Sequence, residues 1–456
     1  QQRLTTIQIL SKAIYDRAKE NEDLGTFIAE NIWHKDSYGK RHFKISHSKV
    51  DKSHFEGILS AKELTDEHTT SDNRLFKSYT FFTKKLESFS VEDCRLLNKV
   101  LMHDMPVISM SLSADADEQM IFDTINSLGV KLTTAELLKN HLFQDEGLHD
   151  LYDTTWFPVF EESESVIAFW EENRSAGRVK RTNLEMLLYC YLIINRSDAD
   201  IKIENLFSEY KKWIKTMSLG EKKTFLKELV EYAELYQSFP DEAELNQISF
   251  SQHRHRLFHV IEQLSISTAL PLILYLYKRV SGAETLTAIL RVLESYLVRR
   301  TVCKLTTKNY NKMFVSVLNR LTKLDAISEE AFDNILRSWD DQSNLYPTDE
   351  HFKSEFLTAK LYNKIAREIL FCIALKQTSH VYSEDHTLSS NSLSLEHVMP
   401  KKWRNNWEAD LTPEQEQKRD RTLLTLGNLT LLTKRLNSKL RDSHWDKKRE
   451  VLKEYS

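Results

Sequence analysis

Three short segments near the carboxyl end of the chain combine residue types that can hydrolyse a phosphodiester. Glu396-His397 is followed by Pro400, and Asn428 and Asn437 come later. A histidine can deprotonate water because its pKa lies near working pH. A carboxylate and an amide oxygen are ligands that Mg²⁺ accepts while it keeps several of its waters. The set therefore predicts metal-assisted hydrolysis.

The spacing around these residues predicts the elements that position them. Apolar residues alternate over 393–399, which indicates a short strand. A second alternation over 429–431 indicates another strand, and an apolar stripe over 445–455 indicates a helix. In a regular strand Glu396 faces away from His397, so the strand must be distorted if the two side chains are to converge.

The order strand, strand, helix and this residue set resemble the ββα-metal motif of His-Me finger (HNH-type) nucleases. In that family the first strand carries Asp/Glu-His, an apolar residue, any residue and Pro. The second strand begins Asn-Leu, and another Asn follows nine positions later. Glu396-His397, Asn428 with the leucine after it, and Asn437 match this pattern. The resemblance implies a nuclease domain over residues 386–456 that cuts DNA with Mg²⁺ or Mn²⁺.

The same resemblance implies a role for each residue. His397 is the general base, and Asn428 joins the catalytic group by holding the loop that orients His397. Asn437 is a metal ligand, and Glu396 is the second one. Many members frame this region with zinc-binding cysteines, which are absent here. Packing must then hold the domain, and the candidate packing residues are Leu429, Leu432, Trp403, Trp407 and Trp445.

The nuclease-like segment is basic, whereas the rest of the chain is acidic. Residues 397–456 hold 14 Lys and Arg against 9 Asp and Glu, a net charge of +5, and the remainder holds 49 against 58, a net −9. This asymmetry favours polyanion contact through the tail, although a solvated helix face gives the same pattern. Trp403 and Trp407, four residues apart, fit core packing better than base stacking. The candidate DNA-binding residues are Lys401, Lys402, Arg404, Lys434, Arg435, Lys439 and Arg441.

The front of the chain carries a second set of motifs. Residues 1–6 read Gln-Gln-Arg-Leu-Thr-Thr, residues 122–129 read Phe-Asp-Thr-Ile-Asn-Ser-Leu-Gly, and residues 136–140 read Glu-Leu-Leu-Lys-Asn. With Arg299-Arg300 at the end of a long apolar helix, they resemble signatures of the GmrSD-like, modification-dependent restriction enzymes. That family includes phosphorothioate-sensing effectors of bacterial phage defence.

This family resemblance implies a ParB-like front domain that binds or hydrolyses a nucleotide, with GTP and ATP as the candidates. It assigns Gln2, Arg3, Asn126 and Lys139 to nucleotide binding. The Asp-Gly that precedes the front motif in the family is absent here, and Leu128 stands where many members have Arg. Taken without the family, the same residues are a polar helix start, a turn and an exposed helix end.

The expected fold is mainly α. It comprises an incomplete α+β ParB-like sensor domain (1–149), a helical domain (150–385) and the ββα nuclease domain (386–456). Only 9 Gly and 7 Pro interrupt the chain, which leaves room for long helices. Helices are expected at 184–194, 206–217, 221–238, 255–279, 284–303, 309–324, 329–339 and 352–375, a strand at 106–112 and a polar linker at 379–392.

Composition narrows the class of protein further. Four cysteines far apart exclude a disulfide framework and favour a reducing cytoplasm. No apolar run is long enough to span a membrane. The leading hypothesis is a cytoplasmic bacterial anti-phage endonuclease acting on double-stranded, modified or phage DNA under nucleotide control. One active site per chain predicts nicking, or double-strand cleavage by a homodimer. The alternatives are a DNA-binding scaffold with an inactive nuclease domain, and an NTPase or nickase acting through the front domain.

Overall fold

The chain divides into two compact units, which are described separately. They are Gln1–Ser127 with Glu161–Glu164, and Leu128–Phe160 with Ser165–Ser456. The computed structural model describes residues 2–47, 49–61, 73–105, 133–176, 179–196, 201–381, 386–405, 407 and 410–454. The predicted strand at 106–112 and Asn126 lie outside these residues.

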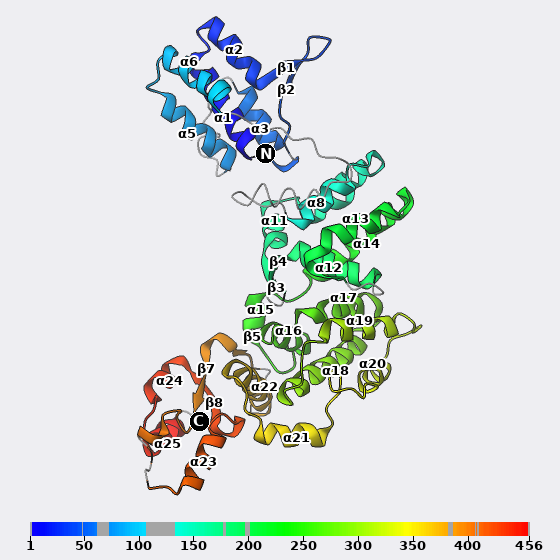
Figure 1. Ribbon diagram of the computed structural model, residues 1–456, viewed down its shortest axis with the longest axis vertical. Coiled ribbons are helices and arrows are strands. Elements are labelled where there is room, and N and C mark those ends of the chain that lie inside the picture. Colours follow the sequence, from blue (N-terminus) through cyan, green and yellow to red (C-terminus); the bar gives the residue numbers. More distant parts are fainter. Residues whose placement is uncertain are drawn as a thin grey trace. The chain divides into compact units, whose positions relative to one another are not determined.

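The first unit is a small helical bundle with one hairpin (Figure 1). Its apolar core includes Ile14, Ile28, Phe55 and Leu59, which are buried. Asn21 accepts a hydrogen bond from the Leu24 N–H and so starts a second helix soon after the first. The elements are α1 (Gln2–Ala18), α2 (Glu22–Ile32), β1 (Trp33–Lys35), β2 (Arg41–Phe43), α3 (Lys49–Ser60), α5 (Arg74–Leu86), α6 (Val91–Lys99) and η1 (Val100–Asp104).

The second unit begins with a series of helices around one large apolar core. The predicted central helix is confirmed, because α12 (Asn183–Asn195) is buried on nearly every side. The elements before it are α8 (Thr134–Leu142), η2 (Glu146–Leu148), α9 (His149–Leu151), η3 (Tyr152–Trp156), α10 (Phe157–Phe160), α11 (Glu164–Glu171) and the hairpin of β3 (Asn173–Ala176) and β4 (Val179–Thr182). After it come η4 (Ile203–Asn205), α13 (Leu206–Lys215), α14 (Leu219–Gln237), α15 (Glu242–Asn246) and β5 (Gln247–Ile248).

Two of the expected helices in this unit are wrong in length, since each is two helices. The segment predicted at 255–279 breaks at Ser265, whose φ of 58° is incompatible with an α-helix, and Pro271 starts the second piece. The segment predicted at 352–375 breaks where Ala359 turns to extended backbone. The observed helices are α16 (His253–Gln263), η5 (Ser267–Ala269), α17 (Leu270–Arg279), α18 (Ala283–Val302), α19 (Tyr310–Leu321), α20 (Glu329–Arg337), α21 (Asp349–Thr358) and α22 (Asn363–Val381).

Described residues of the segment expected to be a polar linker form regular structure. Within it, β6 (Leu388–Ser389) pairs with β5, and η6 (Ser390–Ser392) follows. The Arg367 guanidinium on α22 donates to the Ser390 hydroxyl at 2.7 Å. Arg367 also pairs with Glu368, which is 2.8 Å from the buried ring of His259 on α16. Ser390 of this segment is therefore held by α22.

The chain ends in a strand pair and short helices, drawn in orange and red in Figure 1. These are β7 (Leu393–His397), η7 (Trp403–Asn405), α23 (Pro413–Thr422), η8 (Leu426–Asn428), β8 (Leu429–Thr433), α24 (Lys434–Leu440) and α25 (Trp445–Glu454). The fold is mainly α, as predicted, while the ParB-like and His-Me finger architectures stay predictions.

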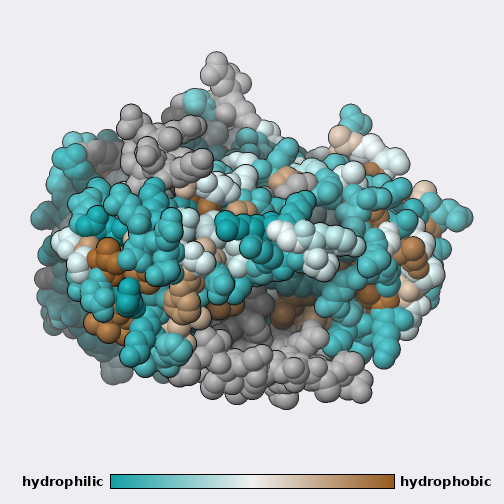
Figure 2. Space-filling model, turned by 90° about the horizontal axis from the view of Figure 1, so that it is seen from above, coloured by the Kyte–Doolittle hydropathy of each residue, from teal (hydrophilic) through white to brown (hydrophobic). Residues whose placement is uncertain are grey.

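No described helix is long and apolar enough to cross a bilayer. Hydrophilic side chains predominate on the face in Figure 2, where hydrophobic ones form small patches.

Candidate active site

The two strands predicted to frame the site form an antiparallel pair. Leu393 lies opposite Thr433, and the register continues without interruption to His397 opposite Leu429. Leu395 and Leu429 pack in an apolar cluster with residues of α22. The alternation of apolar side chains thus anchors one face of the pair, and this anchoring fixes which way each polar residue points.

His397 is the last residue of β7 and is half-buried. Its Nε2 is buried and has no hydrogen-bond partner among the described residues. Burial, together with the nearby ammonium groups of Lys401 and Lys448, lowers the pKa of His397 to about 4. The ring is therefore neutral near pH 7, with a nitrogen lone pair able to accept a proton.

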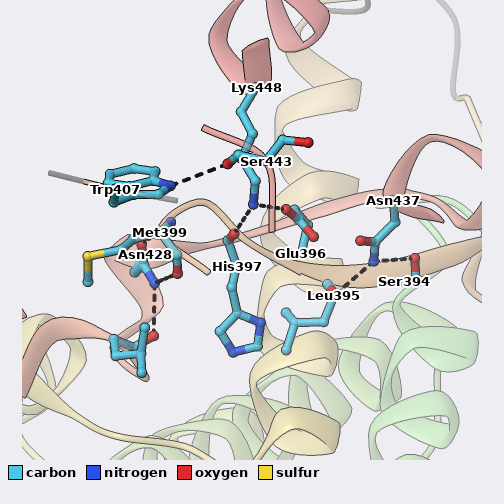
Figure 3. A network of polar contacts seen from close by, with 11 residues as sticks. Ser394, Leu395, Glu396, His397, Met399, Trp407, Asn428, Asn437, Ser443 and Lys448 are labelled. Carbon is cyan, nitrogen blue, oxygen red and sulfur yellow. Dashed lines mark hydrogen bonds and ion pairs between the residues drawn. The ribbon is translucent and has the colours of Figure 1, made fainter. Parts of the chain in front are cut away.

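Glu396 is buried and forms an ion pair with Lys448 of α25. The Lys448 Nζ lies 2.5 Å from the Glu396 Oε1 and also donates to the His397 carbonyl at 2.8 Å. Burial raises the pKa of the Glu396 carboxyl, and the Lys448 hydrogen bond opposes that rise. Figure 3 shows Glu396 and Lys448 on one side of β7 and the His397 ring on the other. The strand is not distorted, so the two side chains do not converge.

Asn428 ties the loop after β7 to the loop before β8. Its carbonyl accepts from the Val398 N–H at 2.9 Å, and its Oδ1 accepts from the Met399 N–H at 2.8 Å. Its Nδ2 donates to the Met399 carbonyl at 3.0 Å and to the Leu423 carbonyl at 2.9 Å. These bonds use every polar group of the side chain and fix the chain immediately after His397.

Asn437 lies on α24 and is bound to β7 through its amide nitrogen. The Nδ2 donates to the Ser394 hydroxyl and to the Leu395 carbonyl, both at 2.9 Å. These bonds leave the Oδ1 with no donor among the described residues. Because residues two apart in a strand share a face, Ser394 puts Asn437 on the Glu396 side of β7 (Figure 3).

A carboxylate and an amide oxygen on one side of a strand fit a magnesium ion in kind, since Mg²⁺ takes few protein oxygens and keeps waters. Asn437 offers its free Oδ1 for this purpose. Lys448 binds the Glu396 Oε1 at 2.5 Å, so Glu396 can offer a metal only its other carboxylate oxygen. No group of three or more His, Cys, Asp or Glu side chains suited to a metal occurs in the described part of the chain. The arrangement thus fits a hydrated Mg²⁺ better than a fully protein-ligated metal.

The predicted DNA-binding residues differ in their surroundings. Arg404 is paired with Asp420 at 2.7 Å and Glu416 at 3.3 Å, so its charge is already balanced. The others are exposed on the loop after β7 and on and beside α24: Lys401, Lys402, Lys434, Arg435, Lys439 and Arg441. Trp403 is 2% exposed and donates to Asp420, so its predicted packing role is confirmed.

The predicted nucleotide-binding residues fall in different parts of the chain. Gln2 and Arg3 lie in the first turn of α1, in the first compact unit. Lys139 lies in α8, in the second unit. Thr133 and Glu136 form a capping box at the start of this helix. Asn126 is outside the described residues, and the nucleotide site stays a prediction.

Lys448 is the residue of this region that sequence reasoning missed. It is fully buried although it is a lysine. The signal was present, because Lys448 lies three residues after Trp445 and three before Val451, on the apolar stripe of the predicted helix. A charged residue within an apolar stripe predicts a buried partner of opposite charge.

Comparison with known families agrees with the resemblance at both ends of the chain. Residues 1–143 match the N-terminal domain of the GmrSD restriction endonucleases, and residues 346–456 match their C-terminal domain. The second match contains β7, β8, α24 and α25, and therefore the whole candidate site. A search of curated proteins gave no match. The two family matches together define a DNA-cutting hydrolase of restriction systems. The chain belongs to the GmrSD restriction endonuclease family.

Proposed function

We propose that this restriction endonuclease cuts DNA by metal-dependent hydrolysis at a His-Me finger centre built from β7, β8 and α24. The observation that carries the proposal is the unpartnered Nε2 of His397 at the end of β7. A buried nitrogen without a hydrogen bond is costly, which favours a role in binding a water or substrate.

In this mechanism His397 accepts the proton of the attacking water. Its lowered pKa keeps the ring neutral, and Asn428 holds the loop directly after it. Glu396 does not compete as a base, because Lys448 occupies its Oε1. Lys401 and Lys402 are exposed just beyond the site and can attract the phosphate backbone.

A divalent metal would be held by the Asn437 Oδ1, with the remaining Glu396 oxygen as the second ligand. These groups lie on the side of β7 opposite the His397 ring, so the proposal requires the end of β7 to rearrange when DNA and metal bind. When bound, Mg²⁺ or Mn²⁺ supplies positive charge that stabilises the leaving oxygen of the phosphodiester. Two protein oxygens are enough, because the rest of the coordination shell of Mg²⁺ is commonly water.

The first unit is proposed to be the regulatory part of the enzyme. Its match to the GmrSD N-terminal domain supports a sensor that acts on modified or phage DNA in the bacterial cytoplasm. Nucleotide binding, by GTP or ATP, would involve Gln2, Arg3, Asn126 and Lys139. The division into domains 1–149, 150–385 and 386–456 is part of the same proposal, as is a homodimer for double-strand cleavage.

Plasmid cleavage tests the proposal directly. Wild type and His397→Ala are compared with EDTA, Mg²⁺ or Mn²⁺, on unmodified and modified DNA, with and without GTP or ATP. We expect metal-dependent cutting that falls by at least about 100-fold in the variant, because general-base catalysis contributes that much. Arg404→Gln is the matched control, since Arg404 is paired with acidic residues away from the strand pair.

Each other outcome points to another activity. Cutting that survives His397→Ala moves the active site elsewhere in the chain. DNA binding without cutting under any condition supports a scaffold. Nucleotide turnover that His397→Ala leaves unchanged, without metal-dependent cutting, assigns catalysis to the first unit.

A further inference from the structure

A cleft of about 500 Å³ opens beside the candidate active site. Val398 and Met399 line it, and they directly follow His397 in the chain. A Cβ added to Gly427 would meet no atom within 4 Å, which shows that the cleft is open at this point. Among the described residues, the lining consists of Val398, Met399, Trp407, Thr422, Thr425, Gly427, Asn428 and Trp445.

Two indole rings form the aromatic part of the lining. The rings of Trp407 and Trp445 have centroids 6.0 Å apart and are tilted by 49°. Trp445 is 36% exposed although it is a large apolar residue, and Trp407 is half-buried. Figure 3 shows Trp407 near Met399, with its indole nitrogen bonded to the Ser443 carbonyl.

Most polar side-chain groups of the lining already form hydrogen bonds within the protein. The Thr422 hydroxyl donates to backbone carbonyls of α23, and the Thr425 hydroxyl donates to the Thr422 carbonyl at 2.7 Å. The Trp407 indole N–H is bonded to Ser443. The cleft therefore offers mainly apolar contact and the faces of aromatic rings. Such a lining suits a flat aromatic ligand, whichever hydrogen-bonding groups lie along the edge of that ligand.

The surroundings of the cleft favour a polyanion as the molecule that carries this ring. Lys401 and Lys402 follow the lining residue Met399 after one proline, and both are exposed. Lys447 is also exposed, two residues after Trp445. Aromatic faces bordered by cations are the features with which proteins bind unstacked nucleic-acid bases.

We propose that this cleft holds a nucleobase of the DNA substrate, turned out of the base stack next to the phosphodiester that is cut. This inference rests on the proposed function of His397, because it needs DNA to lie across the end of β7. A base pair must open for the base to enter, so a mismatched site binds more tightly than a paired one. Little base preference is expected, because the hydroxyls of Thr422 and Thr425 and the Trp407 indole N–H are already bonded within the protein.

The test measures binding without cleavage. The full chain with His397→Ala is titrated in EDTA with two fluorescent duplexes, one fully paired and one with a single central mismatch. We expect tighter binding of the mismatched duplex. Adding Trp445→Ala or the cleft-filling Gly427→Leu should remove this preference and weaken mismatch binding on the order of 10-fold, as loss of one stacked base does. Trp445→Phe should keep most of the preference for the mismatched duplex, because a phenyl ring can still stack on a base.

Tyr362→Ala is the control for loss of an exposed aromatic residue, since Tyr362 is 82% exposed and does not line the cleft. Thermal unfolding of each variant shows whether it is folded. Equal affinity of the two duplexes, or a preference that persists in folded Trp445→Ala and Gly427→Leu, would overturn the inference. Failure of the proposed function is seen separately, as metal-dependent cutting that His397→Ala does not remove.

Discussion

At the scale of single residues, the candidate site is dominated by a buried ion pair next to its histidine. Lys448 contacts both the Glu396 carboxylate and the His397 carbonyl, so it fixes the end of β7 from the side opposite the ring. Such a pair contributes little net stability compared with apolar residues, but removal of one partner leaves a buried charge uncompensated. Its main effect is then on the position of the strand end.

This arrangement gives a residue-scale prediction for Lys448→Met. The variant should lose about 3–5 kcal/mol of unfolding free energy, because Glu396 stays buried without its cation. The double variant Glu396→Gln/Lys448→Met should recover most of the loss. Urea unfolding at neutral pH measures both. The exposed neighbour Lys447→Met is the control, and an equal effect of the two single variants would contradict the prediction.

At the scale of elements, Asn428 is the link between the two strands. Three of its polar groups form hydrogen bonds with the loop after β7, beyond the backbone hydrogen bonds that pair the two strands. The loop that these bonds hold directly follows His397. Asn428 thus connects the geometry of the strand pair with the position of the proposed general base, His397.

Asn428→Ala should therefore reduce both stability and cleavage. Loss of the side chain leaves the Met399 N–H and two carbonyls without partners, and each buried unsatisfied group costs about 1–3 kcal/mol. Asn428→Asp keeps the acceptor for Met399 but loses the donor, so an intermediate effect is expected. Chemical unfolding and the cleavage rate are measured together. Unchanged cleavage in a destabilised Asn428→Ala variant would show that the loop does not orient His397.

At the scale of the whole molecule, positive charge is concentrated at one end of the chain. Residues 397–456 carry an excess of basic side chains, whereas the rest of the chain is acidic. Most of the predicted DNA-binding residues are exposed. DNA affinity should then fall steeply with salt, because each phosphate contact releases counterions.

Salt titration of DNA binding distinguishes residues that contact phosphate from those that do not. Lys434→Gln and Arg435→Gln should each reduce the slope of log K against log salt by about 1. Arg404→Gln should leave the slope nearly unchanged, since Asp420 and Glu416 already balance its charge. If Arg404→Gln lowers the slope as much as the other two, the internal pairs do not persist on DNA.

The sequence by itself determined the mainly helical fold, the strand pair and the GmrSD family. These follow from local periodicity, and from motifs whose residues lie within a few positions of one another. Periodicity does not show where a helix breaks, and Ser265 and Ala359 interrupt two helices expected to be continuous. Turns of this kind depend on packing around them more than on residue type.

Only the tertiary structure decided what surrounds the site residues. In the folded chain, Lys448 pairs with Glu396, which lies 52 residues earlier in the sequence. Asn428 likewise bonds to Met399, which lies 29 residues earlier. It also set Trp407 and Trp445 around one cleft and neutralised Arg404. The physical reason is that burial and charge pairing depend on distances between segments, and sequence spacing determines those distances only within one helix or strand.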